Sequence, residues 1–94
     1  MIDEIARKFE SVVIKYYEIR LYRYDDAVKV IDECEARQIK IWGFDSFKLV
    51  PPGIQPFMEF SPDYSKIEAS LTWQKAREDI EKCSHMDFVF EVVY

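Results

Sequence analysis

The residues best suited to chemistry in this sequence are its single histidine, His85, and the nearby Cys83 and Asp87. Imidazole, thiolate and carboxylate are all zinc ligands, but a structural zinc site needs four well-placed ligands, and Cys34 would have to come from another element. A Cys–His nucleophile pair is the other chemistry that this spacing offers. However, Cys83 falls on the apolar face of a predicted helix, and no obvious neighbour orients the ring. These residues predict neither a metal site nor a catalytic centre.

The rest of the sequence adds no catalytic motif. Its two glycines, Gly43 and Gly53, cannot build a phosphate-binding loop, and no nucleophile-elbow or dinucleotide fingerprint is present. Carboxylate pairs such as Asp25-Asp26, Asp32-Glu33 and Glu78-Asp79 lie on the predicted solvent faces of helices, where solvation explains them better than acid–base catalysis. We predict a protein that is not an enzyme and that binds no metal or other cofactor.

Composition indicates a folded, acidic domain. Its 94 residues are 49% hydrophobic and 16% aromatic, unlike a disordered chain, and 18 acidic against 13 basic side chains give a net charge of −5. A nucleic-acid surface needs clustered Lys and Arg, so this balance argues against RNA or DNA as a partner. It suits a basic protein partner, attracted at long range, although the same charge would also serve to keep a small domain soluble.

The chain has the features expected of a cytoplasmic protein. No apolar run approaches the ~18 residues of a membrane span, and the segment MIDEIARKFE is charged and amphipathic, unlike a signal peptide. Cys34 and Cys83 both fall on apolar helix faces, so we expect buried free thiols in preference to a disulfide.

Hydrophobic periodicity predicts a helix and then a strand in the first quarter of the chain. Apolar residues from Ile2 to Tyr16 recur at three- and four-residue spacing, as on a helix with one buried stripe. Residues 17–24 then alternate like a strand, unless a single long helix continues through Tyr22. Asp25-Asp26 is a candidate N-cap for the helix predicted over residues 26–37.

The middle of the chain is predicted to be mostly β-structure. Residues 39–42 alternate as a strand, and after Gly43 and Asp45 residues 47–50 form either the return arm of a hairpin or a bulged continuation. Pro52-Gly53 suits the centre of a type II turn, with positive φ at the glycine. Pro56 confines the strand expected at about 57–60 to an edge or to its own beginning, and Ser61-Pro62-Asp63 resembles the start of a short helical turn.

The last quarter gives the clearest pattern. Trp73 lies on the apolar stripe of a helix predicted over residues 70–84, and the apolar run 88–94 is predicted as a strand inside a sheet. Together these elements predict a single α+β domain over residues 1–94. Its sheet would contain four to six antiparallel or mixed strands, with two to three helices packed on it.

Seven residues are predicted to contribute to a partner-binding face. They are Trp42, Asp45, Phe47, Lys48, Asp63, Tyr64 and Glu68. The first four lie next to turns expected at Gly43 and at Pro51-Pro52-Gly53, and these turns would hold them on a rigid frame. Trp42 alternates with Ile39 and Ile41 and would be an exposed interface anchor, unless helices cover both faces of the sheet and bury it. The last three combine carboxylates with an aromatic ring, as a nucleic acid combines negative charge with flat bases.

The segment GFDSFKLVPPGI, residues 43–54, carries a resemblance to a known family. Preceded by a helix ending in Arg37-Gln38 and a strand with Trp42, it resembles the immunity proteins of the anticodon-cleaving colicins. In that family a helix and a short apolar strand lead into Gly-x-Asp, and a Pro-Gly turn follows. Gly43, Asp45, Pro52 and Gly53 stand at those positions. The resemblance covers residues 26–94 and implies an α+β fold that plugs the RNA-binding cleft of a tRNA-cleaving toxin by mimicking the anticodon.

Two functions of different classes are therefore expected. The first is an immunity or antitoxin-like inhibitor, which would bind a basic ribonuclease toxin domain and block its RNA-binding cleft with an acidic and aromatic surface. The second is a structural or assembly module, for example a homodimer joined through the N-terminal helix and strand, with no inhibitory role. Neither involves a nucleic acid or a membrane as partner.

Overall fold

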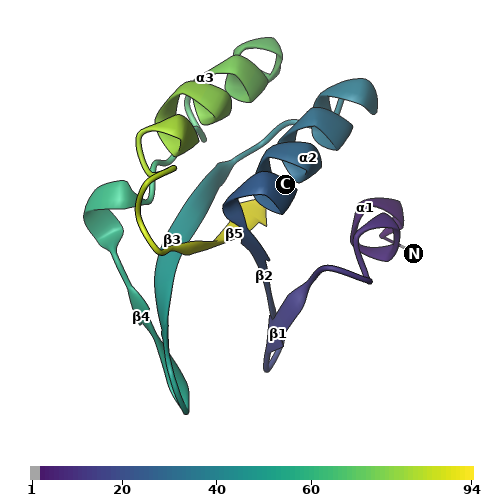
Figure 1. Cartoon of the computed structure of the whole chain (residues 1–94). Helices are drawn as coiled ribbons and strands as arrows, with labels where there is room; N and C mark the ends of the chain where they lie inside the picture. The colour runs from purple at the N-terminus through teal and green to yellow at the C-terminus, as the bar shows by residue number, and fades with distance from the viewer. Residues whose placement is uncertain (1–2) are drawn as a thin grey trace.

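A computed structural model describes residues 3–94 of the chain and shows helices packed on one face of a curled antiparallel sheet (Figure 1). The elements are α1 (Glu4–Lys8), β1 (Ile14–Tyr16), β2 (Ile19–Arg23), α2 (Tyr24–Ala36), β3 (Gly43–Val50), β4 (Gly53–Pro56), the 3-10 helix η1 (Met58–Phe60), α3 (Ala69–Glu81) and β5 (Val89–Val93). The strands are hydrogen-bonded in the order β1-β2-β5-β3-β4, and each neighbouring pair is antiparallel. The predicted α+β class and a sheet of four to six strands are confirmed.

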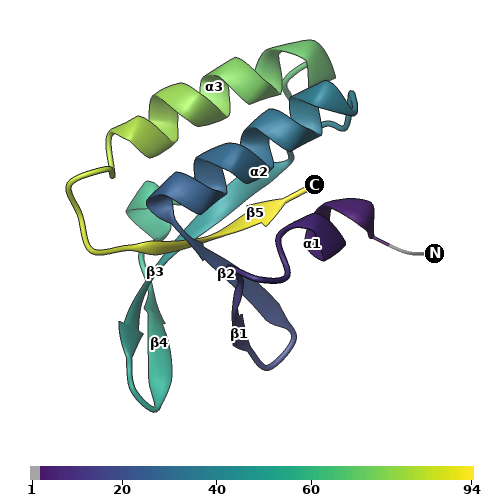
Figure 2. The same cartoon turned by 45° about the vertical axis from the view of Figure 1, so that its right-hand side comes forward.

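The main core lies between the sheet and the helices α2 and α3, which run side by side across it (Figures 1 and 2). Apolar residues at helical spacing bury one face of each helix: Ala27, Val30, Ile31 and Cys34 in α2, and Trp73, Ala76 and Ile80 in α3. Each buried Val or Ile contributes about 1.5–3 kcal/mol. The Trp73 indole N–H also donates to the Ile39 carbonyl at 2.8 Å, so its one polar group is satisfied.

Strand β5 is the central strand of the sheet, as predicted for the apolar run at 88–94. Its alternate residues point to opposite faces, with Phe90 and Val92 in the main core and Val89 on the other face. On that other face, the hairpins β1–β2 and β3–β4 bend away from the helices and enclose a smaller apolar cluster (Figure 2). We call the side of β3 and β5 that carries Asp45, Phe47, Val89 and Glu91 the helix-free face.

The helix and the strand predicted in the first quarter of the chain are both longer than those observed. Helix α1 spans only Glu4–Lys8, capped by Asp3, whose carboxylate accepts from the Ala6 N–H at 2.9 Å. Residue 2, part of the predicted stripe, lies outside the described residues. The β-branched run from Val12 to Ile14 disfavours a longer helix, and β1 begins at Ile14. The predicted strand 17–24 is β2, shortened at its start because Tyr17 and Glu18 form the hairpin turn.

Helix α2 begins two residues earlier than predicted. Arg23 is its N-cap, so Asp25 and Asp26 occupy the first turn instead of the cap. Their negative charge is still favourable there, because the N-terminal end of a helix carries positive partial charge. Helix α3 lies within the predicted residues 70–84 except for its first residue, and ends before the predicted boundary.

The middle of the chain differs most from prediction. Residues 39–42 are not a strand, and Gly43 and Asp45 form no turn, because β3 runs unbroken from Gly43 to Val50. The turn into β4 consists of Pro51-Pro52, joined by a cis peptide bond, and Gly53 already pairs with Val50 as the first residue of β4. The type II turn centred on Pro52-Gly53, with positive φ at the glycine, is therefore wrong.

The predictions for the segment after β4 are also partly wrong. Pro56 does lie on an edge strand, since β4 ends the sheet. Residues 58–60 form the 3-10 helix η1 instead of a strand, with Phe57 as its N-cap. The Phe57 and Phe60 rings pack on Phe88, at centroid distances of 5.0 and 5.5 Å. No helix begins at Ser61-Pro62-Asp63. None of the helices described is long and apolar enough to cross a membrane.

Candidate partner-binding site

Gly43 holds two distant segments of the predicted site together. Its φ of +153° is rarely adopted by other residues, and a Cβ there would lie 2.4 Å from the Pro62 carbonyl oxygen. The close approach is fixed by a β-bridge between Gly43 and Asp63 and by the Tyr64 N–H, which donates to the Trp42 carbonyl at 2.8 Å. Glycine is therefore required here for a backbone contact, and the contact brings Trp42 next to Asp63.

Trp42 is 48% exposed, which decides between the two alternatives left open by the sequence. The Lys40 ammonium lies 4.1 Å from the centre of its ring and donates to the Ser65 carbonyl at 3.1 Å. The Ser65 N–H in turn donates to the Asp63 carboxylate at 2.8 Å and lowers the pKa of Asp63. A cation–π contact at such an exposed site is worth about 0.5–1 kcal/mol. Trp42 is thus an oriented, solvent-facing indole with charged neighbours.

Two predicted site residues are buried and cannot meet a partner directly. Tyr64 is 1% exposed, and its hydroxyl donates to the Asp79 carboxylate at 2.7 Å; burial, reinforced by this bond, raises the pKa of the phenol. Phe47 packs in the smaller cluster with Leu21 and Val89. The sequence placed Phe47 on a surface because alternation alone does not show that the hairpins curl over the second face. It placed Tyr64 there because of its acidic loop neighbours, whereas the ring packs in the main core.

Lys48 and Glu68 are exposed, but the described contacts do not bring them next to Trp42. Lys48 lies near the far end of β3, with its ammonium 5.6 Å from the Phe57 ring centre. Six residues of extended chain separate it from Trp42, about 20 Å. Glu68 is the N-cap residue of α3, where the Ser70 hydroxyl donates to its carboxylate at 3.3 Å. Of the seven predicted residues, the structure brings only Trp42 and Asp63 into one place through these contacts.

Asp45 has a partner that the sequence analysis missed. It lies directly opposite Glu91 on the helix-free face, so two carboxylates face each other across β3 and β5. Burial, and then the charge of Asp45, raise the pKa of Glu91. Like charges directly opposite each other destabilise a sheet by about 0.2–1 kcal/mol. Neither carboxylate forms an ion pair with another described residue. The available signal was that Glu91 is the one charged residue in residues 88–94.

The groups considered for catalysis do not form a reactive site within residues 3–94. Cys34 and Cys83 are buried free thiols, as expected, and burial raises the pKa of both, that of Cys34 to about 12. Both are therefore protonated at neutral pH and poor nucleophiles. His85 is exposed in the turn after α3. In this part of the chain, no three His, Cys, Asp or Glu side chains are grouped to hold a metal ion.

Comparison with known proteins found no relative of this chain. No protein-family model, no curated protein and no solved structure matches the chain.

Proposed function

We propose that this protein is an immunity or antitoxin-like inhibitor that binds the basic RNA-binding cleft of a ribonuclease toxin domain with its helix-free face. The observation that carries the proposal is the pair of carboxylates, Asp45 and Glu91, which repel each other in the free protein. A cationic side chain of the partner, placed between them, would replace that repulsion with attraction to both. Binding would then relieve a cost already present in the fold.

An RNA-binding cleft supplies the required chemistry. Such a cleft presents Lys and Arg side chains spaced to contact phosphates, and often aromatic rings on which bases stack. Asp45 and Glu91 offer negative charge, and Trp42 offers an exposed flat ring. Trp42 lies at the end of the same pair of strands, where its backbone N–H donates to the Val93 carbonyl at 2.7 Å. The net charge of −5 would also attract a basic partner at long range.

The resemblance of residues 26–94 to the immunity proteins of anticodon-cleaving colicins supports the choice of a ribonuclease as the basic partner. Two of the positions that carry the resemblance, Gly43 and Asp45, are the residues that position Trp42 and form the carboxylate pair. The proposed partner is therefore a toxin domain that cleaves RNA, and the proposed mode of inhibition is occupation of its substrate cleft.

The test is inhibition of RNA cleavage by the ribonuclease domain encoded beside this gene. We expect stoichiometric inhibition by the wild-type protein, with an association rate that falls as salt rises because exposed charges are screened. Trp42→Ala should cost on the order of 2 kcal/mol in affinity, about a thirtyfold rise in Kd. The proposal fails if no ribonuclease domain is encoded there, or if that enzyme cleaves RNA equally well with the protein present.

A matched pair of variants separates the site from overall charge. Asp45→Lys and Glu78→Lys change the net charge equally, but Glu78 is exposed on α3, in the helix layer on the opposite side of the sheet. Asp45→Lys should weaken inhibition strongly while the fold persists, since the new ammonium pairs with Glu91. Glu78→Lys should change only the association rate. Equal effects of both substitutions would contradict binding through the helix-free face.

An assembly role is the second candidate, favoured by apolar surface at the free ends of the two hairpins. Tyr17 is 88% exposed in the turn of β1–β2, with a φ of +54° that is unusual for a tyrosine, and Leu49 and Val50 are exposed beside the turn of β3–β4. A second copy of the chain would bury these groups. Light scattering across a concentration series tests this role: a stable dimer that Tyr17→Lys dissociates would favour it over inhibition by a monomer.

A further inference from the structure

The ends of the two hairpins form an exposed apolar surface that points away from the helices (Figures 1 and 2). Tyr17 is 88% exposed in the β1–β2 turn, and Leu49 and Val50 are 41% and 50% exposed beside the β3–β4 turn. A Cβ at Gly53 would lie 3.6 Å from the Tyr16 hydroxyl oxygen, so the two hairpin ends lie next to each other. The hairpin-end surface, as we call it, consists of Tyr17, Leu49, Val50 and Pro52.

Tyr17 is held in an unfavourable backbone conformation. Its φ of +54° lies in the left-handed region, which glycine and asparagine adopt at lower cost than an aromatic residue does. The Tyr17 ring meets the Tyr16 ring edge-on, at a centroid distance of 4.8 Å and an interplanar angle of 89°, and this contact orients it. A ring so exposed gains little from burial in the free protein. Because backbone strain gathers at ligand contacts, the strained and exposed Tyr17 points to a binding role.

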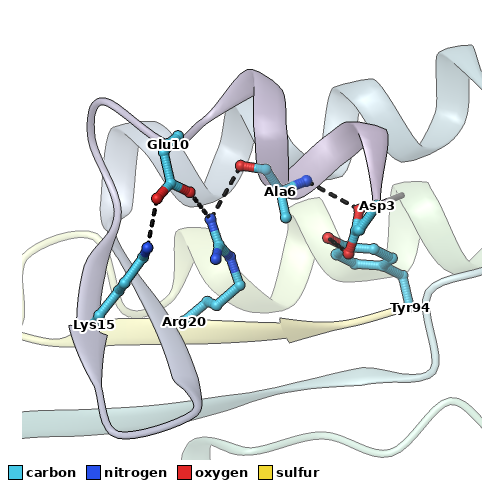
Figure 3. Close-up of polar contacts among 6 residues, drawn as sticks. All are labelled: Asp3, Ala6, Glu10, Lys15, Arg20 and Tyr94. Carbon is cyan, nitrogen blue, oxygen red and sulfur yellow. Dashed lines mark hydrogen bonds and ion pairs between the residues drawn. The ribbon is translucent and has the colours of Figure 1, made fainter. Parts of the chain in front are cut away.

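Charged side chains are nearly absent from the hairpin-end surface. Residues 49–56, LVPPGIQP, contain none, although 33% of the chain is charged. In the β1–β2 hairpin, Lys15 and Arg20 reach toward α1, where both contact the Glu10 carboxylate (Figure 3). Their charges are therefore offset away from the turn, and Glu18 is the one charged side chain of the turn itself. An apolar surface of a partner can cover these hairpin ends at little cost in charge desolvation.

The hairpin-end surface continues the helix-free face. Leu49 follows Asp45 and Phe47 at alternate positions of β3, so the three side chains point to the same side of the sheet. Ile54, opposite Leu49, and Tyr16 pack on the cluster that contains Phe47. Asp45 and Leu49 are four residues of extended chain apart, about 13 Å. A protein interface of ordinary size is wide enough to cover both the carboxylates and the hairpin ends.

The area of the hairpin-end surface argues against a second copy of the chain as its only occupant. Burying Tyr17, Leu49 and Val50 would remove on the order of 300 Å² of apolar surface from water on each chain. Stable interfaces bury about 800 Å² per partner, so two copies that met through the hairpin ends alone would fall well short. Both copies would also carry a net charge of −5 and repel each other.

We infer that the hairpin-end surface docks in an apolar depression of the same partner that the acidic face binds, with the Tyr17 ring as its anchor. This inference rests on the proposed function, because it names a second part of that interface. The depression is lined by aliphatic or aromatic side chains and lies beside the partner's basic cleft. The carboxylates speed association through long-range attraction, whereas burial of the uncharged hairpin ends slows dissociation.

The experiment measures binding kinetics and RNA cleavage separately, with the ribonuclease domain encoded beside this gene. Tyr17→Asn is the main variant, because asparagine tolerates the positive φ and the fold should persist. We expect the Kd to rise about thirtyfold through faster dissociation, while the association rate and its salt dependence stay unchanged. Tyr17→Phe keeps the ring and should bind within about threefold of wild type.

Two further variants make the result specific to the hairpin ends. Leu49→Gln combined with Val50→Thr leaves Tyr17 in place and should raise the Kd about tenfold. Leu71→Gln is the control, because Leu71 is an equally exposed apolar residue, at 58%, but lies on α3 in the helix layer. It should leave the Kd unchanged. Urea unfolding of each variant establishes that it is folded under the conditions of the binding assay.

Several outcomes would overturn the inference. One is a wild-type dissociation rate in both Tyr17→Asn and the double variant, and another is an equal effect of Leu71→Gln. A wild-type dimer in light scattering that Tyr17→Asn dissociates would assign the surface to a second copy. Co-sedimentation with phosphatidylglycerol vesicles that Tyr17→Asn abolishes would assign it to a lipid surface.

The two proposals fail separately. Binding of the ribonuclease domain that depends on Tyr17, without inhibition of RNA cleavage, would remove the proposed function and keep the docking surface. Inhibition that depends on Asp45 but not on Tyr17 would remove this inference and keep the proposed function.

Discussion

Replacing Glu91 with glutamine should make the free protein more stable and its partner complex weaker. In the antiparallel pair β3–β5, Asp45 and Glu91 are directly opposite, which places their Cβ atoms about 4.5–5.5 Å apart. At pH 7 the two charges repel, and the burial of Glu91 adds to the cost of ionising it. Glu91→Gln keeps the size of the side chain, removes the repulsion and lets an amide N–H donate to Asp45.

The expected gain is about 0.2–1 kcal/mol, the range for like charges opposite each other in a sheet. Glu91 is partly exposed, so the interaction is screened by solvent and should not exceed that range. For a domain of this size, 1 kcal/mol corresponds to a change in Tm of about 4–8 °C, so the variant should melt about 1–8 °C higher at pH 7. Glu78→Gln, an exposed control on α3, should shift the free energy of unfolding by less than about 0.5 kcal/mol.

The pH dependence of stability is a second test of the repulsion between Asp45 and Glu91. Because the folded protein raises the pKa of Glu91, the folded state takes up this proton at a higher pH than the unfolded state does. The contribution of Glu91 to stability is therefore favourable below its unfolded pKa and is lost as pH rises through the folded pKa. The gap between Glu91→Gln and wild type should be widest at neutral pH and should narrow as pH falls through the raised pKa of Glu91.

The assay is thermal and urea unfolding of both proteins from neutral to acidic pH, followed by circular dichroism. A variant that melts at the wild-type temperature or below it at pH 7, with a gap independent of pH, would refute repulsion between Asp45 and Glu91. Higher stability together with weaker inhibition of a ribonuclease would be the pattern of a residue retained for binding. Higher stability with undiminished inhibition would leave the pair without a role in the interface.

Three further outcomes can be measured on the isolated protein. Gly43→Ala should lower the free energy of unfolding by at least about 1–3 kcal/mol, because the φ of residue 43 is unfavourable for alanine and the new Cβ would meet the Pro62 carbonyl oxygen. A loss below about 0.5 kcal/mol in urea titrations would contradict that contact. Tyr64→Phe should cost about 1.5 kcal/mol by removing a hydrogen bond to the Asp79 carboxylate, and a neutral effect would show the bond to be dispensable. Hydrogen bonds, first from Lys15 and then from Arg20, lower the pKa of Glu10 to about 2 from an ordinary 4.5, so its contribution to stability is present above pH 4.5 and lost as pH falls toward 2. Glu10→Gln should therefore be less stable than wild type at pH 7, with a gap that closes toward pH 2 in acid titrations; a constant gap would contradict this ion pair.

The elements that sequence alone predicted best are those with a strong period. The stripes of α2 and α3, with Trp73 among them, and the apolar run of β5 each repeat often enough for the buried face to be identified. The N-terminal region failed because its apolar spacing fits a helix while the chain in fact turns twice. One of these turns uses Tyr17 at positive φ, where a Gly or Asn would have marked the hairpin.

The site was only partly predictable for a related reason. The sequence left the exposure of Trp42 open, since alternation with Ile41 fits both an exposed and a covered face. The scarcity of glycine indicated a special backbone position at Gly43, but it suggested a turn in place of the close contact that is found. The atom that enforces that contact, the Pro62 carbonyl oxygen, is nineteen positions away in sequence and approaches only in the folded chain. The pairing of Asp45 with Glu91 depends on strand order and register, which no local pattern specifies.

The position of β5 has a consequence for biosynthesis. Strand β5 lies between β2 and β3, so it alone joins the β1–β2 hairpin to the β3–β4 hairpin in the sheet. While residues 89–93 are still being translated, the nascent chain consists of two separate hairpins, and an isolated hairpin is marginally stable in water. Asp45 also lacks its opposite carboxylate until then. Residues 89–93 must therefore have left the ribosome before the acidic face exists, and a product that stops before them would carry neither the completed sheet nor the proposed inhibitory surface.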